Sequence, residues 1–266
     1  MRVCRMAGEF QRGLKTQIRC ISALIIRDVM SHYGRANIGF LWIVLEPLIL
    51  ATGVMTIWHT LKPSFEHGVP ILRMAFTCYL PLTLWRHLTN SCLGLLSHSY
   101  GLLYHRRITL VDIVISRLAL EAMGTTTALV FAYLVLAAAD LIELPTEPSW
   151  AVAGWISMIV LAGGMGFILA ILSEYSEATQ RFVQPMQYLM LPLSGAFFMV
   201  DWLPTSAQSI ALLNPTVHCY EMFRAGVLGD SVVTHFTPWY PALCGMVLFA
   251  IGIYGLDSLR SKLHPN

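Results

Sequence analysis

Three side chains that could perform acid–base chemistry lie close together in the last third of the sequence. His218, Glu221 and Arg224 are spaced three residues apart, so on a helix they would share one face. An imidazole beside a carboxylate can exchange protons or begin a metal site, but a metal ion needs a third ligand within reach. We therefore interpret the three as a local lock of hydrogen bonds and an ion pair, and we predict neither a metal site nor a catalytic residue.

Two further charges lie inside apolar stretches, where an ionised side chain is costly without a partner or water. Glu46 precedes Pro47, whose missing N–H interrupts the hydrogen-bond ladder of a helix. The pair suits a hinge or a polar contact between helices. Arg86 lies near the middle of another apolar stretch, where it either extends towards the membrane surface or lines a lumen. Glu46, Pro47 and Arg86 are candidate pore or hinge residues.

Aromatic rings form a second group of candidate pore residues. The faces of such rings can stack on the C–H surfaces of sugars without tight hydrogen bonds, but Trp and Tyr also gather at ordinary membrane interfaces. The rings within apolar stretches are Trp58, Tyr79, Trp85, Tyr188, Phe197 and Phe198.

Sequence motifs of the common hydrolytic centres are absent. The chain has no GxxxxGK[ST] phosphate loop, no HExxH helix and no GxSxG elbow. We expect no ATP hydrolysis by this chain and no cofactor bound to it.

The elements that position these residues follow from the scarcity of charge. Of 266 residues, 17 are basic and 15 acidic, 56% are hydrophobic, and the mean hydropathy is +0.63. A soluble domain of this size needs about twice that charged share. A net charge of +2 also argues against a nucleic-acid partner. The composition therefore predicts an all-α polytopic membrane protein.

Charge-free runs locate six transmembrane helices, since a crossing needs roughly 20 apolar residues. Runs of 26, 19 and 26 residues separate Glu147 from Glu174, Arg181 from Asp201 and Asp230 from Asp257. A fourth run, Ala122–Ala139, extends back through Arg117 and Glu121, which we place near the membrane surface. The remaining two are Ala36–Leu61 and Ile71–Ser97. Gly164 and Gly245 belong to small-residue clusters that predict close helix packing.

The distribution of basic residues predicts the orientation. Thirteen of the seventeen Lys and Arg residues fall on the side of both termini, seven of them within residues 1–35. Because Lys and Arg are retained in short cytoplasmic segments, we predict that both termini are cytoplasmic. The expected division is a cytoplasmic segment at 1–35, a six-span domain at 36–258 and a short tail at 259–266.

Two regions outside the spans have their own patterns. Leu14 to Met30 has apolar residues at helical spacing and a separate basic face, which predicts an amphipathic helix in the cytoplasmic interface. Between Asp201 and Pro238, two short helices joined by a turn at Asn214-Pro215 are apolar enough to re-enter the bilayer. Irregular backbone survives at membrane depth only against protein or a water-filled cavity, so this region is a candidate outer gate.

Three ordered blocks of residues resemble the permease subunits of bacterial capsular-polysaccharide and O-antigen ABC exporters. The first block is Arg27-Asp28, Tyr33-Gly34, Gly39, Leu41-Trp42 and Leu45-Glu46-Pro47. The second is Gly101-Leu102, Arg106, Asp112, Arg117 and Glu121, and the third is Asn214-Pro215, Val217-His218, Glu221 and Arg224. The compact NPTVHCYEMFR sequence is more similar to capsule-type permeases.

The resemblance implies one half of a homodimeric pore, energised by two separate ATPase subunits that carry ATP and Mg²⁺. It implies export of a lipid-linked polysaccharide across the bacterial inner membrane, towards a periplasmic co-polymerase or adaptor and an outer-membrane channel. Its implied ATPase-coupling residues are Lys15, Arg19, Arg27, Tyr100, Leu103, Tyr104, Arg106 and Arg107. Its implied outer-gate residues are Asn214, Pro215, His218, Glu221 and Arg224.

Two alternatives stay open at this point. One is an exporter of O-antigen or teichoic acid with the same permease architecture. The other is a membrane enzyme acting on a lipid-linked sugar, with Glu46 or His218 as its acid or base.

Overall fold

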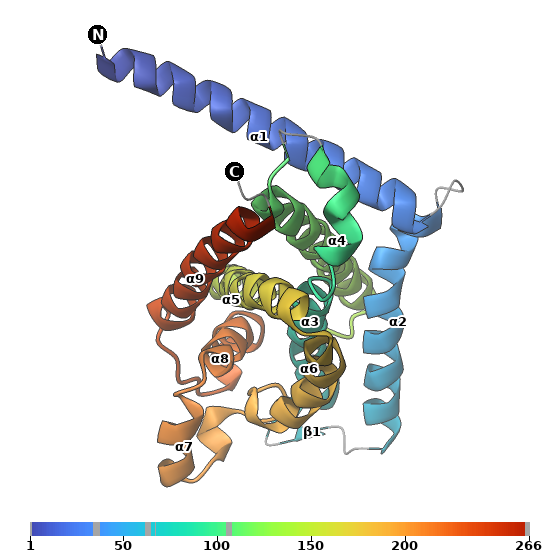
Figure 1. Cartoon of the computed structure of the whole chain (residues 1–266). Helices are drawn as coiled ribbons and strands as arrows, with labels where there is room; N and C mark the ends of the chain where they lie inside the picture. The colour runs from blue at the N-terminus through green and yellow to red at the C-terminus, as the bar shows by residue number, and fades with distance from the viewer. Residues whose placement is uncertain (1, 34–37, 62–64, 67, 105–107, 264–266) are drawn as a thin grey trace.

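A computed structural model describes residues 2–33, 38–61, 65–66, 68–104 and 108–263. These residues are almost entirely helical, which confirms the all-α prediction (Figure 1). The long helices are α1 (Arg2–Tyr33), α2 (Ile38–Leu61), α3 (Ile71–Asn90), α4 (Leu110–Ala138), α5 (Pro148–Tyr175) and α9 (Trp239–Leu263). The shorter helices are α6 (Glu177–Met190), α7 (Thr205–Ala211) and α8 (Pro215–Leu228). Strands β1 (Phe65–Glu66) and β2 (Val69–Pro70) form an antiparallel hairpin before α3.

Three of these helices are long and apolar enough to cross a membrane within the described residues. They are Leu110–Ala138, Pro148–Tyr175 and Trp239–Leu259. Helices α2 and α3 have 24 and 20 residues, but α3 also contains Arg73 and Arg86. A polytopic membrane protein is thus the fold, while the count of six crossings stays a prediction.

The fifth predicted span is not one continuous helix. Helix α6 has 14 residues and ends at Met190, so the apolar run between Arg181 and Asp201 is only half helical. Pro192 follows in a 3₁₀ turn, and Gly195 takes a φ of +85°. A proline disfavours helical backbone at the residue before it, and a positive φ suits glycine. A count of uncharged residues does not reveal these local breaks, and whether this segment crosses the membrane stays a prediction.

Helix α5 lies at the centre of the bundle and packs against α3, α8 and α9 (Figure 1). The packing is close enough to require small residues. A Cβ on Gly164 of α5 would lie 2.6 Å from the carbonyl oxygen of Gly245 on α9. This contact confirms the packing that the glycine clusters predict, and it lies within one chain.

The segment between α6 and α9 contains the two short helices expected from the sequence. Helix α7 ends at Ala211, and α8 begins at Pro215 after the N-cap residue Asn214. The Asn214 side chain accepts a hydrogen bond from the Thr216 N–H at 3.1 Å. Helix α8 is largely buried, and Gly154 of α5 lies directly against its backbone at Cys219. The break at Asn214-Pro215 is therefore confirmed.

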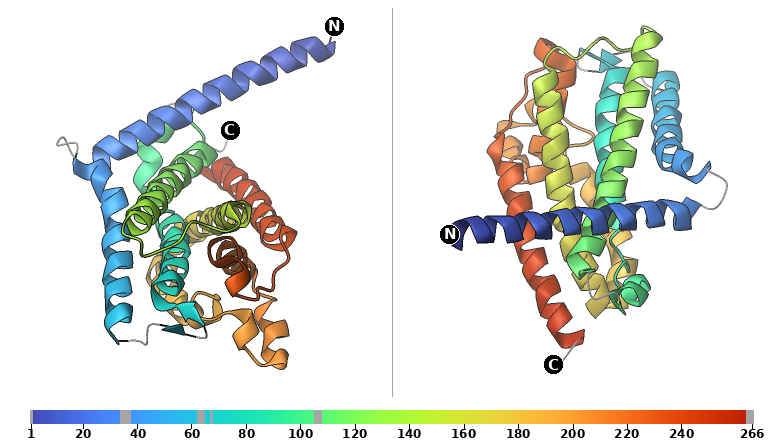
Figure 2. Two further views of the ribbon diagram at one scale, coloured as in Figure 1. Left: turned by 180° about the vertical axis from the view of Figure 1, so that it is seen from behind. Right: turned by 90° about the horizontal axis from the view of Figure 1, so that it is seen from above.

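Helix α1 runs across the bundle rather than along it, and its N-terminal half extends beyond the other helices (Figure 2). It is a continuous helix of 32 residues, longer than the predicted amphipathic segment. Leu24 and Asp28 are buried against the bundle, whereas Ile18 and Ile26 are exposed. The Gln17 side chain donates to Asp112 at 3.0 Å and so joins α1 to the first turn of α4.

Candidate functional site

Arg224 is the centre of a buried polar cluster, which we call the α8 lock and define as His218, Glu221 and Arg224 with their partners. The Arg224 side chain has 0% exposure. It donates to the Phe198 carbonyl at 2.6 Å, to the Ala196 carbonyl, and to Cys78 Sγ at 3.4 Å. The two carbonyls belong to the irregular backbone after α6. The buried Arg224 cation therefore donates hydrogen bonds to backbone carbonyls that have no partner within a helix.

Glu221 and His218 hold two further stretches of irregular backbone. Glu221 accepts hydrogen bonds from the N–H groups of Val200 at 3.2 Å and His235 at 3.0 Å. Its carboxylate lies 3.9 Å from Arg224, close enough for an ion pair. His218 Nδ1 accepts from the Thr237 N–H at 2.9 Å, and Nε2 faces the Leu212 carbonyl at 2.8 Å. Because Nδ1 accepts a hydrogen bond, the ring proton lies on Nε2, which donates to the Leu212 carbonyl.

The α8 lock is occupied by backbone and leaves no free acid or base for a substrate. Both ring nitrogens of His218 are engaged, and Asn214 donates to the Leu193 carbonyl at 3.0 Å. The geometry agrees with a lock, although its partners are mainly backbone groups. Within the described ranges, no group of three His, Cys, Asp or Glu side chains could hold a metal ion.

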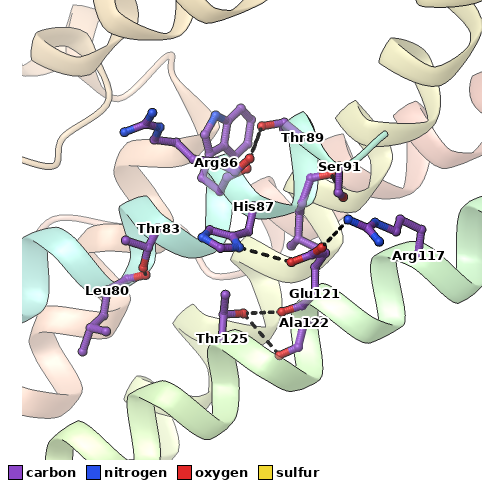
Figure 3. A network of polar contacts seen from close by, with 12 residues as sticks. Leu80, Thr83, Arg86, His87, Thr89, Ser91, Arg117, Glu121, Ala122 and Thr125 are labelled. Atoms are coloured by element: carbon purple, nitrogen blue, oxygen red, sulfur yellow. Dashed lines mark hydrogen bonds and ion pairs between the residues drawn. The ribbon is translucent and has the colours of Figure 1, made fainter. Parts of the chain in front are cut away.

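A second polar network connects α3 and α4 (Figure 3). Glu121 Oε2 lies 3.1 Å from His87 Nδ1, and its Oε1 lies 3.0 Å from Arg117. The Glu121 residue is only 5% exposed. The sequence placed Arg117 and Glu121 near the membrane surface and gave no sign of this network. The His87 contact depends on how α3 packs against α4, which no local spacing encodes.

Arg86 is next to His87 but points away from that network (Figure 3). It donates to the Tyr188 hydroxyl at 3.1 Å, and its guanidinium carbon lies 5.0 Å from the centre of the Tyr188 ring. Both residues line a cavity of about 560 Å³ between α3, α5, α6, α8 and α9. Trp85, Asn214 and Pro215 line it too. The structure thus brings together three candidate pore residues and two candidate gate residues.

Three other candidate pore residues form a separate aromatic cluster. Trp58 of α2 lies 6.0 Å from Tyr79 of α3, and Phe197 lies 6.2 Å from Trp58 and 5.9 Å from Tyr79. Phe198 contributes its carbonyl to Arg224 instead. In α2, Glu46 is exposed and Pro47 is buried. None of these residues lines the cavity around Arg86.

The candidate coupling residues that the structure describes lie on α1 and on the 3₁₀ helix η1 (Ser97–Tyr104). Lys15 and Arg19 are exposed, while Arg27 pairs with Asp28 at 2.5 Å. Tyr100, Leu103 and Tyr104 fall within η1. Arg106 and Arg107 lie outside the described residues.

Comparison with known proteins identifies the class. Residues 19–228 match the model of the ABC-2 type transporter family. The chain belongs to this family as a membrane subunit, and it is not an enzyme. The resemblance drawn from the three sequence blocks is confirmed.

Individual relatives cover nearly the whole chain. The chain is 35% identical over 256 residues to the capsule polysaccharide export inner-membrane protein CtrC of Neisseria meningitidis serogroup B, covering 96% of this chain and 97% of CtrC. It is 31% identical, with the same coverage, to the capsule polysaccharide export inner-membrane protein BexB of Haemophilus influenzae. It is 24% identical to the polysialic acid transport protein KpsM of Escherichia coli, over 91% of this chain and 93% of KpsM.

Proposed function

We propose that this chain is the inner-membrane permease of an ABC export system for capsule polysaccharide, and that its cargo is lipid-linked. The observation that carries the proposal is the match over nearly the full length to proteins named for capsule export. The polysialic acid transporter KpsM points to the same class of polymer. These relatives favour capsule over O-antigen or teichoic acid.

A pore built from two copies accounts for surfaces that one chain leaves open. Glu46 is exposed on the apolar helix α2, where contact with lipid would be costly. Helix α6 has no buried residue, and Phe182, Met186 and Leu189 form an exposed apolar stripe at helical spacing. A second copy would cover this stripe and give Glu46 a polar lumen or a partner.

Two ATPase subunits would bind to the surface that α1 and η1 present. The exposed Lys15 and Arg19 offer a basic surface to an acidic partner. Through Gln17 and Asp112, a push on α1 would reach α4 directly. Family membership implies a separate ATPase, so ATP and Mg²⁺ belong to that partner. In this arrangement both termini, the segment 1–35 and the tail 259–266 are cytoplasmic.

The α7–α8 segment would form the outer gate, facing a periplasmic adaptor and an outer-membrane channel. The α8 lock holds this segment as a unit, so we propose that it moves with α5 and α8 rather than unfolding. Differential contact with the two nucleotide states of the ATPase would drive that movement. Residues 36–258 then constitute the moving permease domain.

Complementation in a capsulated bacterium that lacks its own permease tests this function. We expect this chain, produced with its ATPase, to restore surface capsule, and the variant with Lys15→Ala and Arg19→Ala to reduce export several-fold at unchanged protein level. Ser22→Ala, which removes no charge from α1, is the matched control. Failure of the wild-type chain to restore capsule, with stable protein and ATPase present, would contradict the proposal.

A further inference from the structure

The cavity beside Arg86 has the properties of a ligand site rather than a packing defect. Its volume of about 560 Å³ falls in the range of roughly 300–1,000 Å³ that is usual for small-molecule sites. The wall is mainly hydrocarbon and includes Leu82, Leu161, Leu191 and Val247. Three methionines, Met158, Met165 and Met190, are also part of it. Methionine side chains adapt to irregular apolar ligands, so this wall suits a flexible chain.

Three polar side chains at the edge of the cavity already donate hydrogen bonds within the protein. Gln187 donates to Thr89 at 2.8 Å, Asn214 donates to the Leu193 carbonyl, and Thr216 donates to the Ser194 carbonyl at 3.0 Å. A sugar needs many hydrogen bonds to replace those it makes with water. The cavity offers few, and therefore favours a hydrocarbon over a glycan.

Arg86 is the exception in this apolar surrounding. Among the described lining residues it is the single charged one, and no carboxylate faces it there. Its guanidinium donates a hydrogen bond to the neutral Tyr188 hydroxyl, although a guanidinium has five N–H donors. A cation in an apolar site gains most from an anionic oxygen partner, and Arg binds phosphate and carboxylate with two parallel hydrogen bonds.

The position along α5 indicates where such an anion would come from. Met158, Leu161 and Met165 belong to the middle of the 28-residue helix α5. The phosphate of a bilayer lipid stays at the interface, about half of the ~30 Å hydrocarbon thickness away from the bilayer centre. An amphiphile that is carried across must bring its anionic group past this level.

We propose that the cavity binds the hydrocarbon end of the lipid that carries the exported glycan, with its anionic linkage on Arg86. This inference rests on the proposed function, since it assigns part of the same cargo. The aromatic cluster of Trp58, Tyr79 and Phe197 lies outside the cavity and leaves a separate surface for the sugars. Tyr188 positions the Arg86 guanidinium through its hydroxyl and its ring.

Photolabelling of the permease–ATPase complex in phosphatidylethanolamine nanodiscs tests the inference. The probe is a long-chain alkyl phosphate with a diazirine on the chain, and the matched probe is the corresponding alcohol. We expect the phosphate probe to label Met158, Met165 or their neighbours on α5. Arg86→Gln should reduce its labelling about tenfold, the scale of a lost charged hydrogen bond, while Arg86→Lys retains most of it. Labelling by the alcohol should not change in either variant.

Two further variants separate the cavity from the lipid-exposed surface. Val247→Trp places a large ring at the cavity wall and should reduce labelling by both probes. Val130→Trp lies on the exposed face of α4 and should reduce neither. The assignment would be overturned if these two substitutions changed labelling equally. It would also be overturned if Arg86→Gln left labelling by the phosphate probe unchanged.

Competition identifies the occupant. Lipid-linked glycan extracted from the producing cell should displace the phosphate probe, and phosphatidylglycerol should not. Equal displacement by phosphatidylglycerol would show that the occupant is an ordinary membrane lipid. Crosslinks from Val247 to the second copy of the chain would show that this copy fills the cavity. Either result overturns the cargo assignment. If the probe does not label the protein although export is intact, this inference alone is rejected. If the probe labels a chain that restores no capsule, the proposed function and the cargo assignment are rejected together.

Discussion

Two arginines in this molecule have opposite surroundings. Arg224 has 0% side-chain exposure, and its two terminal nitrogens donate to two backbone carbonyls and a sulfur of the chain itself, while its Nε is buried without a hydrogen-bond partner. Arg86 borders a cavity and donates to one neutral hydroxyl. The first arginine stabilises irregular backbone, whereas the second is available to a ligand. An arginine in a membrane protein therefore marks function only after its donors have been accounted for.

The largest effect that this comparison predicts is the loss of Arg224. Arg224→Met leaves the carbonyls of Ala196 and Phe198 without their donor and Glu221 without its cation. We expect a loss of about 3–5 kcal/mol in the free energy of unfolding, because one partner of a buried ionic cluster is removed. The apparent melting temperature of the purified protein in detergent measures it. A variant as stable as the wild type would contradict the role of the α8 lock.

The network around Glu121 should give the next largest effect. Glu121→Ala leaves His87 and Arg117 without their acceptor, and we expect a loss of about 1.5–3 kcal/mol. Glu121→Gln keeps one acceptor and should lose less. A double-mutant cycle with His87→Ala checks the coupling, since additive losses would mean that the 3.1 Å contact contributes nothing.

Arg86→Gln should be nearly neutral for stability and severe for export. The substitution removes one hydrogen bond and one cation–π contact to the exposed Tyr188, so we expect only about 1 kcal/mol of destabilisation. Surface capsule should nonetheless fall several-fold. Thermal melting and capsule quantification on the same variant separate the two effects. If Arg86→Gln lowered the melting temperature as much as Arg224→Met does, the contrast between the two arginines would be wrong.

The smallest effect concerns the ion pair between the largely buried Arg73 side chain and the exposed Glu143 carboxylate, which are 2.5 Å apart. The hydrogen bond and positive charge of Arg73 hold the pKa of Glu143 below its ordinary value of 4.5. The pair therefore adds stability above pH 4.5, and this contribution is lost as the pH falls through the lowered pKa. In Glu143→Gln, the melting temperature should fall slightly less between neutral and acidic pH than it does in the wild type. An unchanged pH dependence would show that the ion pair contributes nothing measurable.

The sequence was sufficient for features that depend on local chemistry. Asn214-Pro215 predicts the start of α8, because an N-cap side chain and a proline in the first turn are favourable together. The spacing of His218, Glu221 and Arg224 likewise predicts a shared lock. The backbone partners of that lock lie as far away as Ala196, so their identity required the fold.

Long-range packing explains what the sequence did not predict. Glu121 meets His87 across 34 residues, and Arg86 meets Tyr188 across 102. Neither contact can be predicted from helical periodicity, because each joins two different helices. The break in the helix of the expected fifth span has a local cause instead, since Pro192 and Gly195 interrupt helical backbone inside an uncharged run.

Transport by a reconstituted complex tests the central claim most directly. The permease and its ATPase are placed in inverted vesicles, and lipid-linked capsule polysaccharide is added outside with ATP. We predict that the polymer becomes protected from an added glycan-degrading enzyme, and that Arg86→Gln reduces this protection while ATP hydrolysis continues. Polymer that stays fully accessible to the enzyme while the wild-type complex hydrolyses ATP would contradict the assignment of this chain as the export permease.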